Sequence, residues 1–130
     1  MPSVLVIDDE AMICDLIKRA LERLDIQVDT SDSALSGISK FEKGDYDLVI
    51  TDVRMPGVDG YCVVDHIRKS NRGRTPVIGV SGTPWFLQNV DFDKVFPKPF
   101  AIQSLTDAVL ALIKMPTGEQ SDLPEAVCSC

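Results

Sequence analysis

The chain has 130 residues, of which 45% are hydrophobic and 25% charged, a composition typical of one soluble domain and too small for a multidomain enzyme. Thirteen Lys and Arg residues against twenty Asp and Glu residues give a formal net charge of -7, which argues against direct nucleic-acid binding because a polyanion would be repelled. No apolar run approaches the roughly 20 residues of a membrane span, and no signal-peptide pattern opens the chain. We therefore expect no membrane insertion and a cytoplasmic location.

Strand and helix patterns alternate along the first part of the chain. In order, they are an aliphatic run, an amphipathic helix, an alternating strand, a second helix and a second aliphatic run, at residues 4–7, 13–24, 26–30, 34–41 and 48–50. Aliphatic runs that stop at a polar residue are typical of buried strands, and apolar residues three or four positions apart indicate a buried helix face. Asp32 is placed to cap the second helix and Gly44 to end it.

The same alternation continues to a polar C-terminal segment. A third helix, a third aliphatic run, a short helix, a short strand and a last helix are expected at residues 60–69, 77–80, 84–89, 94–97 and 105–112. Alternating strands and helices imply parallel strands joined by right-handed crossovers, so we expect a doubly wound α/β fold with five strands and helices on both faces. We expect one domain over residues 1–114 and a flexible tail over residues 115–130.

Polar residues follow the predicted strands, where ligands bind in open parallel sheets. These residues are Asp8, Asp9, Glu10, Asp52, Ser81 and Lys98. Neighbouring carboxylates repel one another unless a cation lies among them, and hard oxygen ligands suit Mg²⁺. Lys98 and the Ser81 hydroxyl can then hold phosphoryl oxygens, while Asp52, on the middle strand, acts as a nucleophile that forms an aspartyl-phosphate.

Four segments in register resemble the signatures of response-regulator receiver domains. They are residues 4–10, 52–60, 80–82 and 98–100. The resemblance covers residues 3–114 and implies a flavodoxin-like (βα)5 fold with strand order 2-1-3-4-5. It also implies that Asp52 accepts phosphate from a histidine kinase or a histidine phosphotransfer protein.

The resemblance further assigns roles to individual residues. Asp9, Asp52 and the backbone carbonyl of Arg54 would bind Mg²⁺ directly, and Asp8 would bind it through water. Ser81 and Lys98 would bind the phosphoryl oxygens.

Two features depart from the family pattern. Val95 stands where the family usually has an aromatic residue, and the neighbouring Phe96 would point to the opposite face of a strand. The usual coupling through that aromatic residue is therefore in doubt, which leaves the Ser81 loop as the alternative route for the signal. Only 17 positions separate Ser81 from Lys98, so the fourth helix is expected to be shortened.

The leading hypothesis is a stand-alone response regulator that catalyses only its own phosphorylation and dephosphorylation. Sixteen residues follow Lys114, too few for an output domain, so the signal would pass to a downstream effector protein. One alternative is a receiver-like interaction module that does not need phosphate, which Val95 favours. Another is a Mg²⁺-dependent phosphohydrolase, although Arg54 stands where such enzymes usually carry a second acid.

Three other features are given structural interpretations. His66, the only histidine, is expected to be a solvated helix residue. Cys14 and Cys62 are expected to be small apolar helix residues. Cys128 and Cys130 lie in the polar tail without a nearby histidine or further cysteine to complete a metal site.

Overall fold

Five parallel strands form one sheet in the order β2-β1-β3-β4-β5, as predicted for a flavodoxin-like fold. The computed structural model describes residues 2–53, 60–82 and 92–113. The strands are β1 Ser3–Ile7, β2 Gln27–Ser31, β3 Leu48–Asp52, β4 Val77–Ser81 and β5 Lys94–Pro97. Each of the five predicted strands is therefore confirmed to within one or two residues at its ends.

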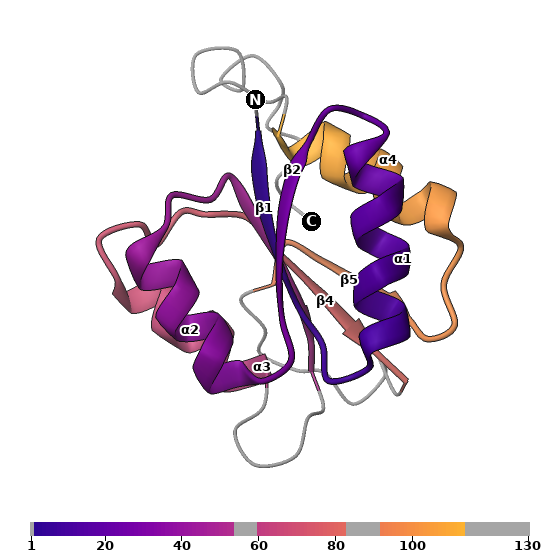
Figure 1. The fold of residues 1–130 in the computed structure, drawn as a ribbon. Coiled ribbons are helices and arrows are strands. Elements are labelled where there is room, and N and C mark those ends of the chain that lie inside the picture. The colour runs from indigo at the N-terminus through magenta and orange to yellow at the C-terminus, as the bar shows by residue number, and fades with distance from the viewer. Residues whose placement is uncertain (1, 54–59, 83–91, 114–130) are drawn as a thin grey trace, which may run out of the picture.

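Four helices of the described residues cover the two faces of the sheet (Figure 1). They are α1 Ala11–Glu22, α2 Ala34–Lys43, α3 Gly60–Lys69 and α4 Ile102–Ile113. Helices α1 and α4 pack on one face, and α2 and α3 pack on the other. The short helix predicted at residues 84–89, like the tail predicted at residues 115–130, lies outside the described residues.

The central strands are buried on both faces, which explains their continuous aliphatic sequences. Along β1, Val4 and Val6 belong to the core beneath α1 and α4, whereas Leu5 and Ile7 belong to the core beneath α2 and α3. Successive side chains alternate between the faces of a strand, so one short run supplies both cores. The sheet is therefore held between two apolar layers.

The helix ends and faces differ in part from the sequence-based expectations. Ser33, not Asp32, caps α2, because Ser33 has an extended backbone and its Oγ accepts a hydrogen bond from the Ser36 amide at 3.1 Å. Gly44 ends the helix as predicted. On α1, Leu16 is 46% exposed, because the helix buries a narrower stripe of residues: Cys14, Ile17 and Leu21.

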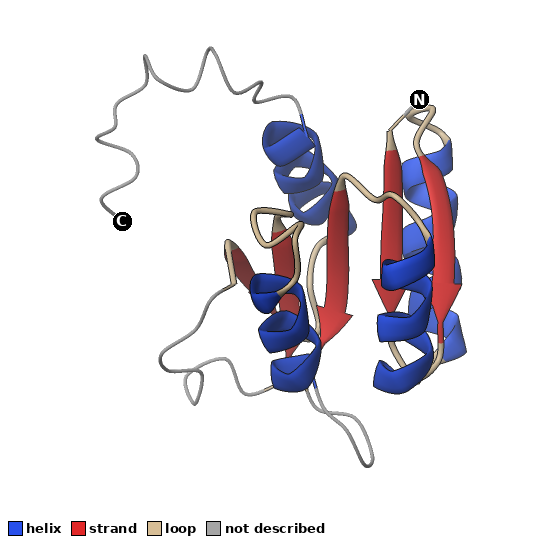
Figure 2. Cartoon of the chain, turned by 90° about the vertical axis from the view of Figure 1, so that its left-hand side faces the viewer, coloured by secondary structure: helices blue, strands red, loops and turns tan. Residues whose placement is uncertain are grey.

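All five strands are parallel and point toward the same edge of the sheet. Figure 2 shows this direction in the strands whose arrowheads are visible. The register pairs Ile7 with Thr51 and Asp52 with Val80. The residues that end or follow β1, β3, β4 and β5 are thus brought to one edge. None of the helices within the described ranges has the length and apolar character needed to cross a bilayer.

Candidate functional site

Four of the predicted site residues lie together at the carboxyl edge of the sheet. Asp8 follows β1, Asp52 and Ser81 are the last residues of β3 and β4, and Lys98 follows β5. Asp8, Asp52 and Ser81 are 2%, 5% and 0% exposed, respectively. The backbone amide of Lys98 donates a hydrogen bond to the Ser81 carbonyl at 2.9 Å, which fixes the base of the lysine beside β4.

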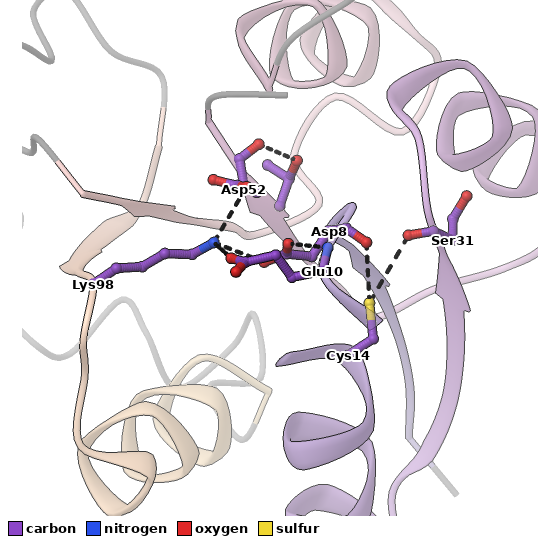
Figure 3. A network of polar contacts seen from close by, with 7 residues as sticks. Asp8, Glu10, Cys14, Ser31, Asp52 and Lys98 are labelled. Carbon is purple, nitrogen blue, oxygen red and sulfur yellow. Dashed lines mark hydrogen bonds and ion pairs between the residues drawn. The ribbon is translucent and has the colours of Figure 1, made fainter. Parts of the chain in front are cut away.

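The Lys98 ammonium joins three carboxylates into one cluster (Figure 3). Its Nζ lies 3.1 Å from Asp8 Oδ2, 2.8 Å from Glu10 Oε1 and 3.2 Å from Asp52 Oδ2. An ammonium group has three N–H donors, so these three contacts can use all of them. We call Asp8, Glu10, Asp52 and Lys98 the Lys98 cluster.

Burial favours the neutral forms of Asp8 and Lys98, whereas the contact between these two residues favours their charged forms. Burial raises the pKa of Asp8, and the nearby Asp52 charge adds to that effect, while the Glu10 amide and Lys98 oppose it. Burial by itself would lower the pKa of Lys98. The hydrogen bond to Glu10 and the charges of Asp8 and Asp52 outweigh burial and raise the pKa of Lys98, which therefore stays protonated at neutral pH.

The carboxylates of the cluster fit a hard divalent cation. One oxygen each from Asp8, Glu10 and Asp52 lies within 4.8 Å of the others. Carboxylate oxygens are the ligands that Mg²⁺ prefers, and Mg²⁺ needs only one or two of them because it keeps several waters. The predicted ligand Asp9 is exposed and Arg54 lies outside the described residues, so their direct roles stay predictions.

Glu10 is the member of the cluster whose role does not follow from the sequence pattern. It follows the paired acids and occupies the N-cap position of α1, where its side chain makes no cap hydrogen bond. Its backbone amide donates to Asp8 Oδ1 at 2.8 Å, so both Asp8 oxygens have partners. The available signal was position: two residues after Asp8, at the turn into α1, a long carboxylate can reach back over the sheet edge.

Cys14 and Cys62 both lie on helices, as predicted, but they differ in burial. Cys14 is buried, and its thiol donates to the Asp8 carbonyl at 3.3 Å (Figure 3). Burial and the neighbouring Asp8 charge raise the pKa of this thiol to about 11, so it is neutral and structural. Cys62 is exposed, because it lies outside the buried stripe of Val63, Val64 and Ile67 on α3.

The side chains of β5 alternate as predicted. Phe96 packs against the core beneath α1 and α4. Val95 pairs in register with Gly79 and is half-buried. Phe96 therefore does not replace the aromatic residue that the family pattern has at position 95.

His66, on α3, lies away from this edge and has a partner on the neighbouring helix α2. Its Nε2 lies 2.9 Å from Glu42 Oε2, and the histidine side chain is 35% exposed. The expectation of a simply solvated histidine is therefore incomplete, since the imidazole links α3 to α2.

Comparison with solved structures reveals close similarity across the described fold. The response regulator protein TrrA of Thermotoga maritima, solved in complex with Mg(2+)-BeF, has 31% sequence identity and a TM-score of 0.79, covering 86% of this chain and 99% of that one. A response regulator receiver domain protein of Clostridium thermocellum has 29% identity and a TM-score of 0.78, covering 87% of this chain and 94% of that one. The chemotaxis regulator CheY4 of Vibrio cholerae, at 24% identity and a TM-score of 0.80, shares the fold.

Curated proteins and a protein family also match the sequence. The transcriptional regulatory protein ResD of Bacillus subtilis is 32% identical over 116 residues, which are 85% of this chain and 48% of ResD. TcrA of Mycobacterium tuberculosis is 30% identical, with 92% of this chain and 51% of TcrA covered. The chain thus spans about half the length of these curated relatives. The response regulator receiver domain family matches residues 4–110, and the chain belongs to that family of two-component signalling domains.

Proposed function

We propose that this receiver domain is a phosphorylation-controlled switch that accepts a phosphoryl group on Asp52 from a histidine kinase or a histidine phosphotransfer protein. The observation that carries the proposal is the pairing of Asp52 Oδ2 with Lys98 Nζ at 3.2 Å, inside a cluster of three carboxylates. Asp52 is almost fully buried but lies at the strand end, where a ligand can approach.

The chain supplies a nucleophile and two groups that hold phosphoryl oxygens. An Asp52 carboxylate oxygen forms a new P–O bond as the P–N bond to the donor histidine breaks, and the electron pair of that bond returns to the imidazole nitrogen. Lys98 donates hydrogen bonds to the transferred phosphoryl oxygens and balances part of their charge. Ser81, at the end of the neighbouring strand, adds a hydroxyl donor.

Magnesium fits the same edge of the sheet. As the family pattern assigns, Asp9, Asp52 and the Arg54 carbonyl would bind it directly, and Asp8 would bind it through water. When bound, Mg²⁺ neutralises negative charge on the phosphoryl oxygens. The similarity to TrrA, which was solved in complex with Mg(2+)-BeF, supports a magnesium site in this chain.

The phosphorylated state would change the affinity of the domain for a downstream effector protein. Phosphorylation can move such an equilibrium only if the phosphoryl group makes different contacts in the two states. Lys98 provides such a difference, because it contacts three carboxylates before transfer and would contact phosphoryl oxygens afterwards. Its backbone hydrogen bond to Ser81 joins that change to β4 and β5.

Incubation with Mg²⁺ and acetyl phosphate, followed by intact-mass measurement, tests the proposal. We expect one phosphoryl group per chain, lost on chelation of Mg²⁺ before the reaction and absent in Asp52→Asn. The control Asp65→Asn, which changes an exposed aspartate on α3, should be phosphorylated like the wild type. An unmodified wild type, or an adduct that persists in Asp52→Asn, would refute the proposal.

Val95 favours a second candidate, an interaction module that binds its partner without phosphate. The half-buried Val95 lacks the aromatic ring that the family pattern uses for coupling. Partner binding that is the same for wild type with Mg²⁺ and acetyl phosphate, wild type alone and Asp52→Asn would support this candidate. Membership of the receiver family argues against the phosphohydrolase alternative.

A further inference from the structure

Glu10 is the exposed member of the Lys98 cluster. Its side chain is 59% exposed, whereas those of Asp8 and Asp52 are 3% and 6% exposed. It nevertheless makes the shortest of the three contacts, at 2.8 Å from Lys98 Nζ. Glu10 thus contacts the ammonium through an exposed side chain, and Figure 3 shows this contact beside those of the two buried aspartates.

The three donors of Lys98 are matched by three acceptors. A phosphoryl oxygen arriving at Asp52 can receive a hydrogen bond from Lys98 only if one of these contacts is given up. The buried contacts to Asp8 and Asp52 are costly to leave unpaired. Glu10 is open to water, so its carboxylate can exchange Lys98 for water at small cost.

We propose that Glu10 is a positioning residue that holds Lys98 before phosphorylation and competes with the incoming phosphoryl group for it. The inference rests on Asp52 being the phosphoryl acceptor. The competition lowers the rate at which the domain reacts with a small phosphodonor. An exposed ion pair of this kind corresponds to about a two- to five-fold change in rate when it is removed.

Two substitutions of Glu10 distinguish the effect of its contact with Lys98 from the effect of its negative charge. Glu10→Gln removes the negative charge and keeps the length of the side chain, so the contact with Lys98 Nζ is weakened to a hydrogen bond with a neutral amide oxygen. Glu10→Asp keeps the charge but shortens the side chain by one methylene group, which breaks direct contact with Lys98. The N-cap position of α1 tolerates both, because the Glu10 side chain makes no cap hydrogen bond.

The matched control is Glu22→Gln. Glu22 is at the other end of α1, about 18 Å away along the helix, and its side chain is similarly exposed, at 48%. Its substitution changes the net charge as Glu10→Gln does. We expect it to leave both readouts at their wild-type values.

The first readout is the rate of Asp52 phosphorylation by acetyl phosphate at saturating Mg²⁺, followed by intact mass. The second needs no phosphodonor: the ¹⁵N–¹H NMR signal of the Lys98 ammonium, which is observable when ion pairs slow its exchange with water. We expect Glu10→Gln and Glu10→Asp each to raise the rate about two- to five-fold and to weaken the signal.

Three other outcomes can be distinguished, and each contradicts a different part of the reasoning. If Glu10→Gln reacts faster while Glu10→Asp matches the wild type, the effect is one of charge and not of contact. Unchanged rates and signals in both variants show that Glu10 does not hold Lys98. If the wild type acquires no phosphoryl group at all, the proposed function itself fails, and the ammonium signal still tests whether Glu10 positions Lys98.

Discussion

Replacing Asp8 by Asn should stabilise the metal-free protein at neutral pH. At an effective dielectric constant of about 20, attraction to Lys98 at 3.1 Å contributes about 5 kcal/mol, and repulsion by Asp52 at no more than 4.8 Å costs at least about 3.5 kcal/mol. The remaining attraction is outweighed by burial, because the pKa of Asp8 is raised overall. The negative charge of Asp8 therefore lowers the stability of the fold.

The side-chain amide introduced by Asp8→Asn would remove this cost together with the contact to Lys98, because an amide NH₂ group would take the place of Asp8 Oδ2 and leave Lys98 with Glu10 and Asp52 as partners. The carbonyl oxygen of the new side chain can still accept the hydrogen bond that the Glu10 backbone amide makes to Asp8 Oδ1 at 2.8 Å. We expect Asp8→Asn to raise the free energy of unfolding by about 1 kcal/mol at pH 7, which corresponds to a few degrees in Tm. The control Asp15→Asn removes an exposed charge on α1 and should change stability by less than about 0.5 kcal/mol.

The gain should depend on pH and on Mg²⁺. A carboxyl group with a raised pKa in the folded state stabilises the fold below its ordinary pKa of 3.8, and that contribution is lost as pH rises through the folded value. The advantage of Asp8→Asn should thus be present at pH 7, shrink as pH falls and disappear in acid below about pH 3.5. Added Mg²⁺ should stabilise the wild type more than the variant.

Urea unfolding in a chelator, at several pH values and then with Mg²⁺, measures both effects. If Asp8→Asn lowers the free energy of unfolding at pH 7, the attraction to Lys98 outweighs burial and the reasoning is wrong. A gain of the same size in acid, at about pH 3.5, and at pH 7 would also refute it, because the charge of Asp8 would not be its source.

Two further predictions concern the body of the fold. Ser33→Ala should cost about 1 kcal/mol in chemical denaturation and Asp32→Ala clearly less, because Ser33 Oγ accepts the Ser36 amide; equal losses would reject this assignment of the cap. Tyr46 donates to Asp29 Oδ2 at 2.6 Å, and its pKa is raised to about 12, chiefly by burial and then by Asp29. Neutral Tyr46 therefore stabilises the fold below about pH 10, and this contribution, at most about 3 kcal/mol before solvent screening, is lost as pH rises through about 12. The stability advantage of the wild type over Tyr46→Phe should shrink over that range, and a constant advantage would contradict the assignment.

The sheet could be predicted because its central strands are short, strongly apolar runs of the sequence. The aliphatic sequence of β1 supplies Val4 and Val6 to one core and Leu5 and Ile7 to the other, so burial on both faces could be inferred without coordinates. Parallel strands then place Asp52, Ser81 and Lys98 at one edge by topology alone. The sequence thus predicted both the sheet and where its polar side chains meet.

The structure differs from the sequence-based predictions in two situations: where neighbouring residues offer the same chemistry, and where a contact joins residues far apart in the chain. Asp32 and Ser33 are both good capping residues, and only the extended backbone of Ser33 decides between them. Glu10 carries no periodic signal, because its contact with Lys98 joins residues 88 positions apart through a long exposed side chain. Such choices depend on tertiary geometry, which a local pattern does not contain.

From the charge of the Lys98 cluster, we expect that a small phosphodonor reacts with Asp52 only in the presence of a divalent cation. With Lys98 protonated, the three carboxylates leave the cluster with a charge of about -2, and a phosphoryl group adds up to about -2 more at neutral pH. Lys98 is already shared among three acceptors and cannot offset both. A bound divalent cation would offset the negative charge that the phosphoryl group adds. The exposed Glu10 side chain can turn toward water and release Lys98. We therefore expect the Mg²⁺ requirement for Asp52 phosphorylation to be weaker in Glu10→Gln, which carries one negative charge fewer at the cluster, than in Glu22→Gln.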